Sequence, residues 1–141
     1  MKKLFLLAAM SLFATGAWSQ VSTNNTSSAD KLGWKLAVHS YTFRKFSIFD
    51  AIDMTAALGV KYMSISGGVT FEGTNGLTTV NLTDAQRDAI DKKLRADGFG
   101  KFGNFFVGQL HADQAKSHKV FERAKQWGIK VLVAEPAPDA L

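Results

Sequence analysis

A carboxylate at the end of an apolar run is the first feature of this sequence that suggests chemistry. Glu135 follows the apolar run 131–134 and precedes Pro136. Burying a carboxylate at the end of a strand costs free energy unless a metal ion or another cation meets it. Oxygen and imidazole ligands suit a divalent cation, such as Mn²⁺, Mg²⁺ or Zn²⁺, that also contacts carbohydrate hydroxyls. We therefore expect Glu135 to ligate a divalent metal; the alternative is a carboxylate that caps a helix or pairs with a lysine.

His39 is the candidate for acid–base catalysis. In an extended strand its side chain would share one face with Ala37, Tyr41 and Phe43. An imidazole titrates near neutral pH, so His39 could bind a sugar hydroxyl or transfer a proton. The alternative is a structural histidine whose hydrogen bonds are satisfied within the fold.

Three further residues are expected to bind a substrate. Phe43 and Phe46 could form an apolar wall against a sugar face, although aromatic residues beside a barrel strand more often belong to the core, and Tyr41 stands beside them after the first strand. His111 follows another apolar run and is expected in a loop. Polar residues near other strand ends widen the set of candidates: Ser64, Ser66 and Gln109. The sequence has no G-x-S-x-G, P-loop or H-E-x-x-H motif and therefore no complete catalytic constellation.

Strands and helices are predicted to alternate along most of the chain. The pattern predicts a long glycine-rich loop over 67–81 and four strands, over 34–43, 60–66, 101–110 and 130–136. Three helices are predicted between the strands, each with an N-cap residue and a terminating glycine: Ser47 to Gly59, Thr83 to Gly98 and Asp113 to Gly128. Thr83 and Gln86 have the spacing of a capping box.

This alternation predicts an α/β fold in which the strands pair in parallel and the helices cover the sheet. No G-x-G-x-x-G follows the first predicted strand, which disfavours a dinucleotide-binding fold. About four βα units are predicted, whereas a complete (β/α)8 TIM barrel needs about 250 residues. We expect residues 32–141 to form the N-terminal half of such a barrel, with the candidate residues at the carboxyl ends of its strands. A half-barrel is either incomplete or must associate with a second copy, because its edges are open.

The N-terminal residues have the pattern of a secretory signal peptide. Lys2 and Lys3 precede a short apolar run, and Ala17 and Ser19 place small residues before a cleavage site. The apolar run is shorter than the ~20 residues that span a membrane. We expect residues 1–19 to be a signal peptide, residues 20–31 to be a flexible polar leader, and the product to be periplasmic or secreted without a membrane anchor.

The composition excludes several kinds of site. The chain has no cysteine, which excludes disulfides and thiolate metal ligands. The formal charge of +5 falls by two, to +3, without Lys2 and Lys3, and the remaining cations are scattered among acidic residues. We therefore expect no nucleic-acid partner.

Two segments of the sequence resemble a known family. Residues 32–46 read LGWKLAVHSYTFRKF, and residues 135–137 read EPA. They resemble the first and fourth strands of the sugar phosphate isomerase/epimerase family, a group of xylose-isomerase-like TIM barrels, over about residues 32–141. The resemblance implies a sugar substrate and an isomerase or epimerase that moves a proton through an enediolate with the help of a divalent cation. It also implies that Glu135 is the metal ligand on the fourth strand.

The sequence departs from that family at the second strand. The relatives usually carry a glutamate there, where this chain has Ser64 and Ser66. The family's further metal ligands come from later strands, so we expect this chain alone to be inactive. A non-catalytic carbohydrate-binding derivative and an oligomerising structural half-barrel stay open as alternatives.

Overall fold

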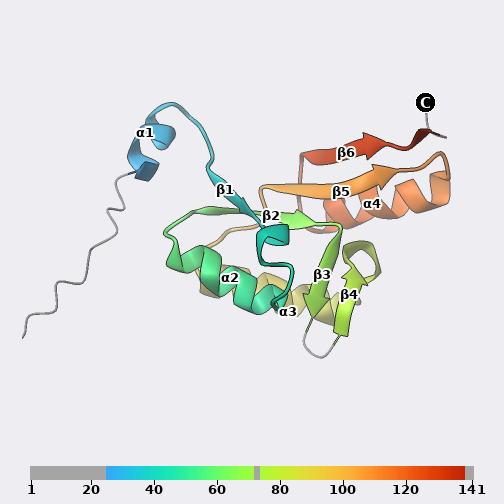
Figure 1. Ribbon diagram of the computed structural model, residues 1–141, viewed down its shortest axis with the longest axis horizontal. Coiled ribbons are helices and arrows are strands. Elements are labelled where there is room, and N and C mark those ends of the chain that lie inside the picture. The colour runs from blue at the N-terminus through green and yellow to red at the C-terminus, as the bar shows by residue number, and fades with distance from the viewer. Residues whose placement is uncertain (1–24, 72–73, 139–141) are drawn as a thin grey trace, which may run out of the picture.

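The computed structural model describes residues 25–71 and 74–138. Four strands form one parallel sheet in the order β1-β2-β5-β6: β1 Ala37–His39, β2 Tyr62–Ser66, β5 Asn104–Leu110 and β6 Leu132–Pro136. The longer helices of the described residues alternate with these strands: α2 Ile48–Ala57, α3 Asp84–Ala96 and α4 Gln114–Gln126. The predicted α/β class and parallel pairing are confirmed, and the arrangement is that of a partial α/β barrel (Figure 1).

One face of the sheet is buried beneath these helices (Figure 1). The strands contribute Met63, Ile65 and Phe105, each with no exposed surface, to a core shared with the helices. The helices contribute these buried residues, among others: Ile52 from α2, Ile90 and Leu94 from α3, and Ala124 from α4. On the opposite face Phe106 and Val133 are 40% and 39% exposed. The burial of apolar side chains therefore fixes the helix-covered face, and the other face is open.

Each predicted helix begins at its predicted capping residue. The Ser47 hydroxyl accepts the N–H of Asp50 at 3.1 Å, and the Asp113 carboxylate accepts two backbone N–H groups. Thr83 and Gln86 form both bonds of the capping box. The glycines predicted to end the helices have positive φ: 70° at Gly59, 86° at Gly98 and 62° at Gly128. These signals depend only on neighbouring residues, and all are confirmed.

The first predicted strand, 34–43, is wrong in its length. β1 pairs with β2 only as far as His39, which lies opposite Ser64, and Ser40–Phe43 form a 3-10 helix, η1. The chain leaves the sheet because the Ser40 hydroxyl accepts the N–H of Ser66 at 2.8 Å, the bond that a longer β1 would supply from its backbone. Tyr41 and Phe43 therefore lie on η1 and not on a strand face with His39.

The prediction of a loop over 67–81 is also wrong, since an antiparallel hairpin lies there. Its elements are β3 Gly68–Phe71 and β4 Thr74–Thr78, followed by the 3-10 helix η2 Thr79–Asn81. Val69 pairs with Leu77 in this hairpin, and both side chains pack on the core. The apolar residues that hold the hairpin are few and stand among glycines and threonines, so the sequence has no clear alternation there.

The predicted polar leader, 20–31, contains a helix. α1 Asn25–Lys31 occupies its second half, which corrects the expectation of a leader without regular structure. Lys61 forms an ion pair with Asp30 at 2.9 Å and links α1 to the segment before β2. The predicted signal peptide, 1–19, lies outside the described residues. In the described ranges no helix has the length and apolar character needed to cross a bilayer.

The end of β2 is held by several buried hydrogen bonds. The carbonyl of Ser66 accepts the Thr79 hydroxyl at 2.6 Å, and the N–H of Thr79 donates to the Gly67 carbonyl at 2.9 Å. Gly67 also has no space for a side chain, because a Cβ there would lie 2.8 Å from the carbonyl oxygen of Val107. A glycine is therefore required where β2 passes β5 and enters the hairpin.

We predict that Gly67→Ala lowers the free energy of unfolding by about 1–3 kcal/mol, because the backbone of β5 must move to admit the methyl group. Urea unfolding followed by circular dichroism measures the change. Gly68→Ala is the matched control, since a Cβ at Gly68 meets no atom within 4 Å. Equal stabilities of the two variants would contradict the close approach at Gly67.

Candidate functional site

The open face of the sheet carries a row of polar side chains. His39 lies opposite Ser64 in the register of β1 and β2, and Ser64 lies opposite Asn104 in the register of β2 and β5. Paired residues of neighbouring parallel strands point to the same face. The next row on this face consists of Ser66, Phe106 and Val133.

His39 is enclosed by aromatic rings. Phe106 meets its imidazole edge-on at 5.3 Å between ring centroids, and Tyr41 stacks beside it at 6.2 Å. Burial lowers the pKa of His39 from its usual value of 6.5, because the charged form loses hydration. The imidazole is therefore mainly neutral at pH 7, the form that can accept a proton or a hydrogen bond.

Two buried polar atoms on this face lack a hydrogen-bond partner among the described residues. They are Nε2 of His39 and Oδ1 of Asn104. Buried polar atoms are nearly always paired in folded proteins, so these two atoms in one row favour a polar ligand or ordered water on this face. Nε and Nη1 of Arg123 are unpartnered in the same way elsewhere in the described residues. Asn104 was missed in the sequence, since only the register of the sheet places it beside His39 and Ser64.

A cavity of about 570 Å³ opens at the carboxyl ends of β1 and β2, beside the middle of β5. Its lining includes His39, Tyr41, Ser66 and Phe106. This volume suits a small ligand, and the mixture of aromatic and polar groups suits a sugar, which has apolar C–H faces and hydroxyl edges. The structure thus places His39, Tyr41 and Phe106 around one cavity.

Glu135 lies on the same face but at the far side of the sheet. It lies two residues after the half-exposed Val133 on β6, so the two side chains share this face, and Glu135 is itself exposed. Strands β2 and β5 separate it from His39. Its register partner is Gln109. Carboxylate and amide oxygens fit the ligand chemistry of a hard divalent cation. Over residues 25–71 and 74–138, however, no group of three His, Cys, Asp or Glu residues could hold a metal ion.

His111 and Phe43 line two cavities that neighbour the His39 cavity. His111 is exposed after β5 and lines a separate cavity of about 460 Å³ with Lys116 and Lys119 at the start of α4. Phe43 is half-buried, packs on the core and lines a further cavity between η1 and α2. Neither residue lines the His39 cavity itself, but each lines a cavity that shares lining residues with it, so their role in binding the same substrate stays a prediction.

Comparison with known proteins supports the fold alone. No family model and no curated protein matches the chain. The chain is similar to the crystal structure of an uncharacterised protein from Parabacteroides distasonis, with a TM-score of 0.65 and 20% sequence identity. The match covers 74% of this chain and 44% of that protein, so the chain spans less than half of the length of its structural neighbour. At this identity the likeness is one of architecture: helices on one face of a parallel sheet.

Proposed function

We propose that this chain forms part of a sugar isomerase or epimerase whose substrate lies on the open face of the sheet. The observation that carries the proposal is the pair of buried, unpartnered atoms on this face, His39 Nε2 and Asn104 Oδ1. A sugar hydroxyl donates and accepts hydrogen bonds, so adjacent hydroxyls could satisfy both atoms. The rings of Tyr41 and Phe106 would contact the C–H surface of the same sugar.

His39 is the acid–base group of the proposed reaction. Its Nε2 would accept the proton from the carbon next to the sugar carbonyl, and the C–H electron pair would form the enediolate. Adding that proton to the former carbonyl carbon, while the hydroxyl proton moves to the former carbonyl oxygen, completes an isomerisation. Adding a proton to the opposite face of the original carbon completes an epimerisation. The lowered pKa of His39 supports this role, because the imidazole begins in its basic form at pH 7.

Glu135 is the proposed contributor of a metal ligand. A bound divalent cation would polarise the carbonyl and hydroxyl oxygens of the sugar. Such a cation requires about three or four protein ligands, and the described residues contain no complete set, so further ligands must be supplied from outside them. The activity is accordingly proposed for the complete barrel, in agreement with the share of the structural neighbour that this chain spans.

A carbohydrate-binding protein without catalysis is the second candidate. Ser64 and Ser66 are buried on the open face, and the backbone of Ser66 is already bound to Ser40 and Thr79. Serines in these positions provide neither a negative charge for a metal nor a base for proton transfer. The two candidates predict the same sugar contacts and differ only in proton exchange.

We predict that the full-length polypeptide, meaning the complete barrel of which this chain is proposed to be part, catalyses proton exchange in deuterated water when supplied with Mn²⁺, Mg²⁺ or Zn²⁺. The exchanged proton is the one next to the carbonyl of a substrate aldose or ketose. NMR of a panel of sugars measures the exchange. His39→Gln should slow it by about 100-fold or more, because the base is lost. His118→Gln is the control, since His118 is exposed on α4, contacts Glu122 and lines neither the His39 cavity nor the cavity between η1 and α2. Sugar binding without proton exchange would exclude the isomerase or epimerase and favour the carbohydrate-binding protein without catalysis.

We predict that Glu135→Gln weakens Mn²⁺ binding by the same polypeptide by about tenfold or more, because a neutral amide replaces a charged ligand. Isothermal calorimetry measures the affinity. Glu122→Gln on α4 removes an equal charge away from the open face and should leave the affinity unchanged. If the unmodified protein binds no divalent cation, the metal-assisted reaction is excluded.

We predict that the pKa of His39, measured by NMR titration, lies below 6.5. Phe106→Leu should raise it toward 6.5 by admitting water beside the imidazole. As the pH drops, His39 is protonated in the unfolded state at a higher pH than in the folded state. The free energy of unfolding therefore falls as the pH drops below about 6.5. A pKa at or above 6.5 would contradict the buried environment of His39.

A further inference from the structure

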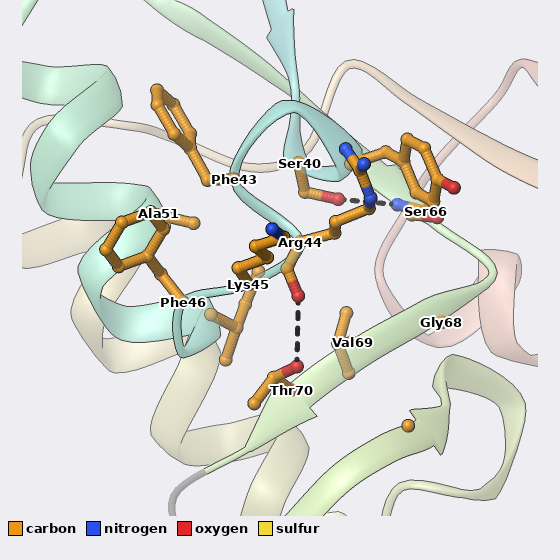
Figure 2. A pocket seen from close by; sticks show the side chains of 13 residues that line it. Ser40, Phe43, Arg44, Lys45, Phe46, Ala51, Ser66, Gly68, Val69 and Thr70 are labelled. Atoms are coloured by element: carbon orange, nitrogen blue, oxygen red, sulfur yellow. Dashed lines mark hydrogen bonds between the residues drawn. The ribbon is translucent and has the colours of Figure 1, made fainter.

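The cavity that Phe43 lines has a volume of about 500 Å³ and lies between η1, the start of α2 and strand β3. Figure 2 shows Arg44 and Lys45 on its η1 side and Val69 and Thr70 on its β3 side. Among the described residues that line it, there are two cations and no carboxylate. The cavity therefore has a net positive lining, which the proposed reaction on the open face does not use.

Both cations are available to a ligand. The Arg44 guanidinium stacks over the ring of Tyr41 at 4.8 Å, which occupies its flat face and leaves its in-plane N–H groups free to donate. Neither Arg44 nor Lys45 forms an ion pair within the part of the chain that the structure describes. A guanidinium with free edge donors is suited to two parallel hydrogen bonds with a carboxylate or a phosphate.

The loop that carries these cations is fixed in place. The Thr70 hydroxyl donates to the carbonyl of Arg44 at 3.3 Å (Figure 2), and the N–H of Arg44 donates to the carbonyl of Tyr41 at 3.1 Å. The N-terminus of α2 is unsuited to an anion, because the Ser47 hydroxyl caps it and the carboxylate of Asp50 lies in its first turn. The backbone of Arg44 and its guanidinium are thus placed before a ligand arrives, which reduces the entropy lost on binding.

This cavity adjoins the cavity beside His39. Tyr41, Ser66 and Gly68 line both. A ligand of sugar size could therefore place one end among the two cations and the rest of its length on the open face of the sheet. The aromatic ring of Tyr41 would lie between the two ends, stacked on Arg44 on one side and near His39 on the other.

We propose that Arg44 and Lys45 bind the oxyanion of a sugar-sized ligand, either a carboxylate or a phosphate group, while its hydroxylated part extends toward His39. The inference rests on the proposed function, since it names acidic sugars as the substrate class. It adds a specificity site, just after η1, whose residues take no part in metal binding or proton transfer.

Calorimetry on the full-length polypeptide tests the site with four probes: ribose 5-phosphate, glucuronate, neutral ribose and inorganic phosphate. We expect at least one acidic sugar to bind about tenfold or more tightly than ribose, with an affinity that falls as salt is raised. The double variant Arg44→Gln/Lys45→Gln should abolish this preference. The stronger of the two acidic sugars identifies the anion as carboxylate or phosphate, and weak binding of inorganic phosphate that is lost in the same variant also supports the site.

Arg95→Gln/Lys92→Gln is the matched control, because it removes the same charges from exposed positions on α3 that line neither cavity. It should retain the preference, and thermal unfolding of both double variants verifies that each is folded. The proposal is overturned if ribose binds as tightly as the acidic sugars, if no probe binds, or if the Arg44/Lys45 variant keeps the preference. A third result separates this site from the proposed function. If neutral sugars exchange their proton and Mn²⁺ still binds, but acidic sugars are not preferred, the anion site is overturned and the proposed function stands.

Discussion

The backbone of Ser66 is held on both sides by buried hydroxyls, and most of the candidate site depends on this arrangement. Ser40 accepts its N–H and Thr79 donates to its carbonyl. The first bond ends β1 and turns the chain into η1, which carries Tyr41 and is followed directly by Arg44. The second fixes η2 at the base of the hairpin, so that β3 lies opposite η1. Since both cavities include Ser66 in their lining, their shapes follow from how this one residue is bound.

The two faces of the sheet have different physical roles. The face beneath α2, α3 and α4 buries Met63, Ile65 and Phe105, and their burial supplies the hydrophobic stabilisation of this part of the chain. The other face carries His39 and Asn104, whose buried polar atoms stay unpaired within the described residues. Unpaired polar groups reduce stability, so a fold tolerates them mainly where a ligand or water pairs with them. The same sheet thus separates the part that stabilises the fold from the part that can do chemistry.

Local signals predicted the helices and most strands correctly. Ser47, Thr83 and Asp113 cap helices through bonds to residues two or three positions away, and such bonds require no information from the rest of the fold. The end of β1 and the hairpin after β2 were predicted wrongly, because both depend on contacts between distant residues. Ser40 meets Ser66 across 26 positions, and the few apolar residues of the hairpin are recognised only when they pack on the core.

The sequence by itself determined the alternation of helices and strands, the parallel sheet and the residue types available for catalysis, because periodicity and capping are properties of neighbouring residues. The tertiary structure decided which of those residues meet. It placed His39 beside Tyr41 and Phe106, added Asn104 through the register of the sheet, and put Phe43 and His111 at other cavities. Register and chain reversal arise from hydrogen bonds and packing between segments far apart in the chain, and no local pattern encodes those contacts.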